Sequence, residues 1–99
     1  MNPQPVVLIN AFEVPEEADE AFLEGWERQR EFLSAQDGYV STRLHRSLSP
    51  DADFRFVNVA RWDSAKAFRD ATSQPEFRNA QLPFRFHASL YELVRGDER

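Results

Sequence analysis

Two asparagines stand in segments that are otherwise typical of apolar β-strands. Asn10 lies within VVLINAFEVP (6–15), and Asn58 lies within FRFVNVARW (54–62), four residues before Trp62 on the same face. Asparagine is depleted in strands, and a buried amide needs several hydrogen-bond partners. Each amide therefore either satisfies neighbouring backbone groups or lines a cavity, where its polar atoms are available to a ligand.

The elements that must position these side chains follow from local patterns. Alternating or continuous apolar runs predict strands, whereas Pro15, the acidic residues after it and the closing Asp37-Gly38 pair bound a helix. The predicted strands are 6–13, 38–48, 54–62 and 84–94. The predicted helices are 15–36 and 63–73, with one or two further turns over 75–81.

This order of strand, helix, strand, strand, helix and strand predicts an α+β, ferredoxin-like split βαβ fold. A right-handed crossover between the first two strands leaves a gap that the third strand fills, so the predicted sheet order is 4-1-3-2. The strands of Asn10 and Asn58 are then neighbours. If both amides face the helices, they and Trp62 line one cavity.

The same topology predicts a homodimer. Strands one, three and four carry apolar residues on both faces, whereas the two helices cover only one face. A second copy of the chain is the simplest cover for the other face, which gives a dimeric α/β barrel packed sheet to sheet.

Composition limits the alternatives. We expect the 99 residues to form a single domain, with a core over 6–94 and polar tails at 1–5 and 95–99. The net charge of −5 argues against nucleic acid as a partner, and the absence of cysteine excludes disulfides and thiolate chemistry. We expect no membrane association and no secretory signal, and therefore a cytoplasmic protein.

Several common site chemistries find no support in the sequence. There is no glycine-rich phosphate loop, no paired histidine motif and no plausible serine triad. The acidic residues 16–20 are typical of a helix start rather than of a metal site.

Four segments in this order carry a resemblance to a known family: INAFEVP, GYVSTRLHRS, FVNVARWDSAKAF and FRFHASLYELV. The chain resembles the antibiotic biosynthesis monooxygenase (ABM) family of small dimeric α+β barrels over residues 6–94. Some members oxygenate anthrone-type polyketides without a metal, flavin or haem. Asn10, Asn58 and Trp62 match the three pocket positions of those members.

The resemblance implies a catalytic role for these three residues and no cofactor. A phenolic anthrone loses a proton to give a carbanion that can reduce O₂ by one electron. Amide donors can polarise the carbonyl and hold the developing oxyanion, and the indole can donate a hydrogen bond and stack on a flat ring.

Two alternatives stay open. Another branch of the family degrades haem with a histidine after the second helix, but this chain has Gln81 at the best-matching position, and its histidines, His45 and His87, lie elsewhere. A third possibility is a non-catalytic dimer that binds a small ligand.

Four further residues are substrate-binding candidates. Phe22 and Trp26, on the apolar stripe of the first helix, belong either to the core or to a ligand platform. Arg78 is a candidate cation for an anionic substrate. His87 is either a proton acceptor or substrate contact, or a polar residue at the dimer seam.

Overall fold

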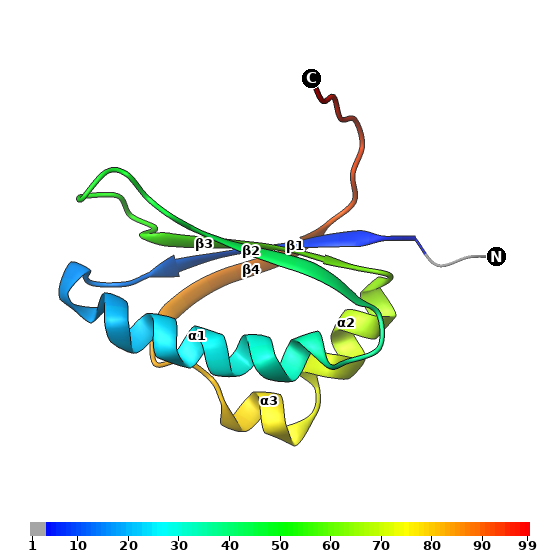
Figure 1. The fold of residues 1–99 in the computed structure, drawn as a ribbon, viewed down its shortest axis with the longest axis horizontal. Helices are drawn as coiled ribbons and strands as arrows, with labels where there is room; N and C mark the ends of the chain where they lie inside the picture. Colours follow the sequence, from blue (N-terminus) through cyan, green and yellow to red (C-terminus); the bar gives the residue numbers. More distant parts are fainter. Residues whose placement is uncertain (1–3) are drawn as a thin grey trace.

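The computed structural model describes residues 4–99, so the expected N-terminal tail lies partly outside the described residues. A four-stranded antiparallel sheet is covered by helices on one face, while the C-terminal segment leaves the sheet on the other side (Figure 1). The elements are β1 Val6–Glu13, the 3₁₀ turn η1 Glu16–Ala18, α1 Asp19–Ser34, β2 Tyr39–Arg46, β3 Phe56–Trp62, α2 Ala65–Thr72, α3 Pro75–Asn79 and β4 Arg85–Tyr91.

The sheet order is β2-β3-β1-β4, which confirms the predicted α+β ferredoxin-like fold and its strand order. β1 lies at the centre and pairs antiparallel with both β3 and β4. Because side chains alternate along a strand, the even-numbered residues of β1, β3 and β4 face the helices. The odd-numbered residues of these strands form the outer face of the sheet.

Local chemistry accounts for the helix boundaries. The Ser64 side chain accepts a hydrogen bond from the Ala67 backbone N–H at 3.1 Å and so caps the start of α2. Pro75 occupies the first turn of α3, where its missing N–H costs no hydrogen bond. Gly38 has φ of 88°, a conformation that favours glycine, and it turns the chain from α1 into β2.

Two side chains lie on different faces from those that simple alternation predicts. A register shift between Tyr39 and Ser41 places Tyr39 opposite Trp62, with the two rings 5.5 Å apart, so Tyr39 lies on the helix-facing side. Phe54 precedes β3 and packs on His87 at 5.2 Å instead of joining Phe56. Alternation fails at both places because the regular ladder is interrupted or has not yet begun.

The core consists of two apolar clusters that lie along the same two central strands. Leu8 pairs with Ala60 in the first cluster, and Phe12 pairs with Phe56 in the second. Phe22 on α1 is fully buried and stacks on Phe56 with ring centroids 4.4 Å apart. The pair between the two clusters is the one formed by the asparagines.

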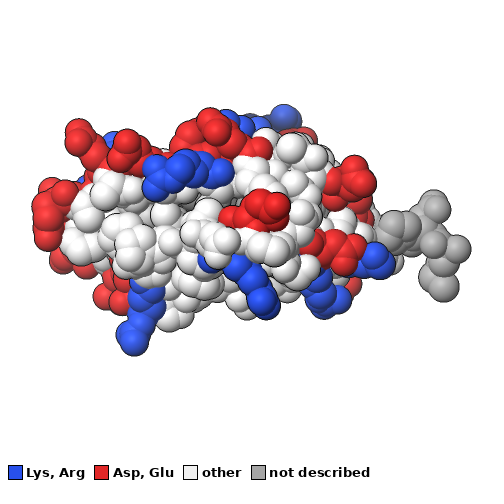
Figure 2. Space-filling model, turned by 90° about the horizontal axis from the view of Figure 1, so that it is seen from below, with Lys and Arg blue, Asp and Glu red and all other residues white. Residues whose placement is uncertain are grey.

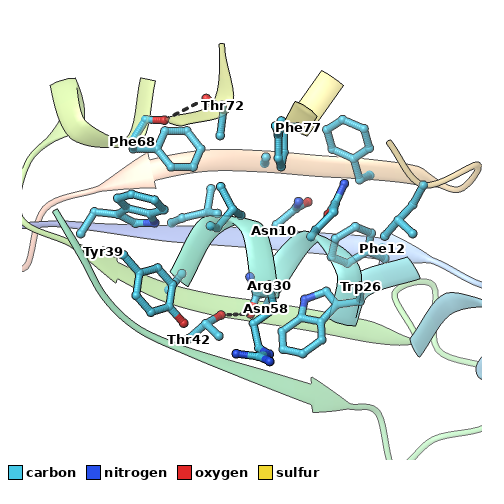
Figure 3. Close-up of a pocket in the computed structure, with 18 of the residues that line it drawn as sticks. Asn10, Phe12, Trp26, Arg30, Tyr39, Thr42, Asn58, Phe68, Thr72 and Phe77 are labelled. Carbon is cyan, nitrogen blue, oxygen red and sulfur yellow. Dashed lines mark hydrogen bonds between the residues drawn. The ribbon is translucent and has the colours of Figure 1, made fainter. Parts of the chain in front are cut away.

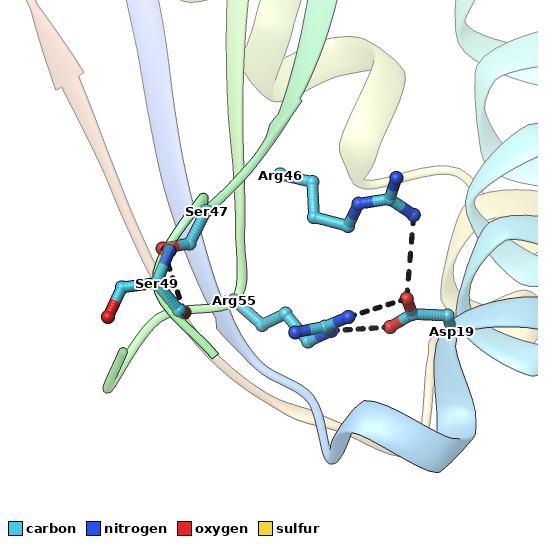
Figure 4. Close-up of polar contacts among 5 residues, drawn as sticks. All are labelled: Asp19, Arg46, Ser47, Ser49 and Arg55. Carbon is cyan, nitrogen blue, oxygen red and sulfur yellow. Dashed lines mark hydrogen bonds and ion pairs between the residues drawn. The ribbon is translucent and has the colours of Figure 1, made fainter. Parts of the chain in front are cut away.

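A group of three charges joins the start of α1 to the β2–β3 hairpin. Asp19 accepts hydrogen bonds from Arg55 at 2.6 and 2.9 Å, and Arg46 lies 3.5 Å away (Figure 4). The hydrogen bond from Arg55 is the main reason that the pKa of Asp19 lies below its usual value. This bidentate contact fixes one end of α1 over the sheet.

The surface on the helix-covered side mixes both signs of charge. Figure 2 shows blue and red side chains interspersed, with no continuous basic area. Within residues 4–99, no helix is long and apolar enough to cross a membrane.

Candidate functional site

The two asparagines form a direct cross-strand pair. Asn10 of β1 lies opposite Asn58 of β3 in the antiparallel register, and both line one cavity between the sheet and the helices. Their position between the two apolar clusters places polar groups on the floor of an otherwise hydrophobic space.

The two amides differ in what they bond. The Thr42 hydroxyl donates to Asn58 Oδ1 at 2.6 Å. The Asn58 NH₂ group is then available to donate to a ligand. Asn10 Oδ1 is buried and has no hydrogen-bond partner among the described residues. Among the described residues, neither oxygen accepts a hydrogen bond from a neighbouring backbone N–H. The structure thus differs from the alternative in which each asparagine satisfies neighbouring backbone groups.

Aromatic and small side chains form the walls of the cavity. Trp62 is only 1% exposed and is held edge-to-face by Tyr39 and by Phe68, whose centroid lies 5.7 Å away. These rings enclose a site whose polar groups are few, as is common in small-molecule pockets (Figure 3). The lining comprises Leu8, Asn10, Phe12, Trp26, Gln29, Arg30, Leu33, Tyr39, Thr42, Asn58, Ala60, Trp62, Phe68, Thr72, Phe77, Gln81, Leu82, Phe86 and Ala88.

The cavity volume sets the size of a ligand that can be enclosed. Its volume is about 140 Å³. An engineered apolar cavity of about 150 Å³ accommodates benzene. The enclosed part of the site therefore matches roughly one aromatic ring, and a larger ligand must reach the opening.

Close packing between α1 and the segment after α3 bounds this space. Gly25 is buried, and a Cβ on it would lie 2.1 Å from Leu82 Cδ2, so only glycine leaves room for Leu82 as it is placed. Gln29 Nε2 donates to the Ala80 carbonyl at 2.9 Å and ties the two segments together. The space beneath Gly25 is thus filled by Leu82, which lines the cavity.

Four of the seven candidate residues line this cavity: Asn10, Asn58, Trp62 and Trp26. The other three do not. Phe22 is part of the core beside Phe12, and Arg78 is exposed on α3. His87 lies on the outer face of the sheet and bonds Glu13 at 2.7 Å, because its neighbours Phe86 and Ala88 take the inward positions of β4.

Sequence reasoning missed five polar lining residues: Gln29, Arg30, Tyr39, Thr42 and Thr72. Arg30 follows Trp26 by four positions on α1, a spacing that places both on one helix face and could have revealed it. Tyr39 was missed because the register shift in β2 turns its side chain to the helix-facing side, opposite to what alternation predicts. Strand alternation places Thr42 on the same face as Leu44, but only the three-dimensional structure shows its bond to Asn58.

Electrostatics divide the lining into neutral and cationic groups. Burial raises the pKa of Tyr39, although the nearby Arg30 charge opposes this effect, so Tyr39 is a neutral phenol at pH 7. Arg30 donates from Nε to Glu27 at 2.6 Å, and this bond raises the pKa of the guanidinium. The site can therefore hold and polarise an oxygen substituent in a largely apolar space.

Comparison with known proteins identifies the family. The antibiotic biosynthesis monooxygenase family matches residues 5–82. The chain belongs to the ABM family. No curated protein matches it at a significant level.

Solved structures agree with this assignment to the ABM family. A "putative monooxygenase" from Shewanella loihica PV-4 is 36% identical, with a TM-score of 0.86 over 97% of this chain and 99% of that one. SnoaB, a cofactor-independent oxygenase from Streptomyces nogalater, is 29% identical, with a TM-score of 0.81 over 94% and 96% of the two chains. The haem-degrading protein Rv3592 from Mycobacterium tuberculosis is 25% identical, with a TM-score of 0.68 over 97% and 100%.

The lining of this ABM-family cavity does not fit haem. The usual iron ligands are histidine, thiolate, methionine or tyrosinate, and the described lining offers only Tyr39, whose neutral form is favoured by burial. His45 and His87 both belong to the outer face of the sheet. Gln81, at the position expected for an iron ligand, lines the cavity but is not a ligand of this kind.

Proposed function

We propose that this ABM-family chain is a cofactor-independent monooxygenase that oxygenates a flat aromatic, anthrone-type substrate with O₂. The observation that carries the proposal is the inward-facing pair Asn10–Asn58, with Trp62 in the same cavity. The similarity to SnoaB, itself named a cofactor-independent oxygenase, supports the same reaction type.

The reaction balances without an external reductant. The CH₂ group of the substrate loses a proton, and the resulting carbanion transfers one electron to O₂. Recombination of the radical pair forms a C–O bond and a peroxide, and O–O cleavage with loss of water leaves a C=O group. The substrate supplies all the electrons, so CH₂ and O₂ become C=O and H₂O.

The three residues have distinct proposed roles. The Asn58 NH₂ group, whose carbonyl oxygen is already bonded to Thr42, donates to the substrate oxygen on which negative charge develops. Asn10, the cross-strand partner of Asn58, donates to the same substrate oxygen through its NH₂ group. Trp62 packs against the ring and contributes an indole N–H.

Conversion of dithranol in chelator-treated, metal-free buffer tests this function. We expect absorbance-monitored turnover with one O₂ consumed per substrate molecule. Because removal of one oxyanion-stabilising donor commonly lowers kcat by about 10²-fold, we expect Asn58→Ala to have an effect of that order. Trp62→Phe, which keeps a ring but removes the N–H group, should also be slower.

Asn79→Ala is the matched control, because Asn79 is an exposed asparagine at the end of α3. It should convert dithranol at the wild-type rate. Equal rates in the Asn58→Ala, Trp62→Phe and control variants would remove the proposed roles, and no turnover by the wild type would remove the proposed reaction for this substrate class.

We also propose that the protein is a homodimer that packs through the outer face of the sheet. Ile9 and Tyr91 belong to this face, and Phe54 packs on it through His87. These three side chains are 36–51% exposed in the single chain. Exposed apolar side chains gathered on one sheet face favour burial against a second copy.

A further inference from the structure

Arg30 is the one charged side chain among the described residues that line the cavity. The lining has no carboxylate and no imidazole in the same described set, although the whole chain carries a net charge of −5. The one charged group of the lining is therefore opposite in sign to the net charge of the protein, and its partner Glu27 lies outside the lining. This contrast favours an anionic ligand in the site.

The position of Arg30 leaves part of its guanidinium free to meet such a ligand. Nε and Nη2 both bond Glu27 Oε1, whereas a guanidinium has five N–H groups. The charged and titratable groups that face it are Glu27 and Glu31 on α1 and Tyr39 on β2. Its side chain is 34% exposed while also lining the cavity, which places it at the opening.

The lining also determines where the first proton of the proposed reaction can go. No Asp, Glu or His is found among the described lining residues, and Tyr39 is a neutral phenol. A general base must lie within hydrogen-bond reach of the proton that it removes. No side chain of the described lining is therefore placed to act as that base, and the site must favour the anion that remains.

We infer that the cavity takes its aromatic substrate as an anion, either a phenolate or an enolate, and that Arg30 supplies the counter-charge. This inference rests on the proposed function for the identity of the substrate class. Arg78, the candidate cation of the sequence analysis, lies outside the cavity. A tricyclic ligand with one ring enclosed would extend toward the opening, where Arg30 lies.

A ligand that cannot be oxygenated separates this inference from the proposed reaction. We choose 1,8-dihydroxyanthraquinone, which already carries both carbonyl groups and changes colour when a phenol ionises. Its visible spectrum is titrated with pH, free and in the presence of excess protein. The pH of half-ionisation reports directly on the charge state that the cavity prefers.

We expect the pKa of the bound ligand to lie about one unit below that of the free ligand. This is the small end of the range for a nearby opposite charge, because Arg30 is partly exposed and paired with Glu27. Binding then releases a proton between the two pKa values, so the dissociation constant falls about tenfold as pH rises across that interval. Arg30→Gln should abolish most of the shift. Arg30→Lys should retain much of it.

Arg28→Gln is the matched control, since it removes the same charge from an exposed position of α1 outside the cavity lining. It should leave the shift unchanged, and circular dichroism checks that each variant folds. If Arg30→Gln does not fold, the pH dependence of wild-type affinity measures the same preference.

Three results would overturn the inference: no binding by the wild type, an unshifted pH of half-ionisation, or a shift that persists in folded Arg30→Gln. A shift that depends on Arg30 in a protein that does not convert dithranol would retain the anion site and reject the monooxygenase function. Turnover of dithranol without a shift in the pH of half-ionisation would retain the monooxygenase function and reject the anion site.

Discussion

At the scale of single residues, the two asparagines show how one residue type can have two energetic roles. Asn58 has a protein partner for its oxygen, whereas the oxygen of Asn10 is buried without one among the described residues. A buried acceptor without a partner costs about 1–3 kcal/mol. Such unpaired buried groups are few in native structures and are found at strained or functional sites.

Asn10→Leu should therefore stabilise the ligand-free protein by about 1 kcal/mol, because an apolar group of similar shape replaces the unpaired oxygen. The same substitution should lower dithranol turnover. Urea denaturation, followed by tryptophan fluorescence, measures the free energy of unfolding.

Thr42→Val serves as the counterpart, since it removes the hydroxyl that bonds Asn58 Oδ1. It should destabilise the protein by about 1 kcal/mol. If Asn10→Leu destabilises the protein as much as Thr42→Val does, the Asn10 oxygen is not unpaired in solution.

At the scale of elements, α1 is fixed at its first turn by charge and along its length by close packing. The Asp19–Arg55 pair holds the start of the helix, and Gly25 allows Leu82 to approach its middle. Both contacts join segments far apart in sequence. Together they set the height of α1 above the asparagine pair.

The contribution of Asp19 should depend on pH. Its folded pKa is depressed, chiefly by the hydrogen bond from Arg55, so the stabilisation is complete above the unfolded value of about 3.9 and is lost as pH falls through the folded pKa. Asp19→Asn should lower the thermal midpoint at pH 7. The thermal midpoints of the wild type and the variant should converge as pH falls through the folded pKa of Asp19, because the carboxylate of the wild type is then protonated.

Asp53→Asn, in the exposed β2–β3 connection, controls for the loss of one negative charge. It should cause a smaller change at pH 7, because Asp53 takes part in no ion pair within residues 4–99. An Asp19→Asn difference that is equally large at low pH would show that the ion pair is not its source.

At the scale of the whole molecule, the helices cover one face of the sheet and leave apolar side chains on the other. Ile9→Lys places a charge in the middle of the outer face, where the proposed dimer would bury it. We expect the wild type to sediment at twice the 11.5 kDa chain mass and Ile9→Lys to shift toward the monomer.

Leu23→Lys is the control, because Leu23 on α1 is 38% exposed and Ile9 is 36% exposed. This variant should remain dimeric. A monomeric wild type at micromolar concentration would contradict the proposed dimer, and equal dissociation of both variants would place the interface elsewhere.

Much of the fold was predictable because its signals are local. Alternation in β1 and β3, the Pro15 and Gly38 boundaries and the crossover rule together gave the strand order that the structure confirms. Alternation failed at Tyr39, where a register shift that no local pattern reveals reverses the side chain. It also failed at Phe54, because β3 begins only at Phe56, where pairing with β1 and β2 starts.

The sequence by itself determined that two amides and a tryptophan lie on neighbouring central strands, since strand periodicity and the handedness of crossovers depend on local stereochemistry. Only the tertiary structure decided which side chains share the cavity with them. Arg30 and Tyr39 enter it and His87 does not, because those positions follow from helix placement, strand register and packing between distant segments. The presence of Arg30 in the lining, on which the inferred anionic ligand depends, is a consequence of that packing.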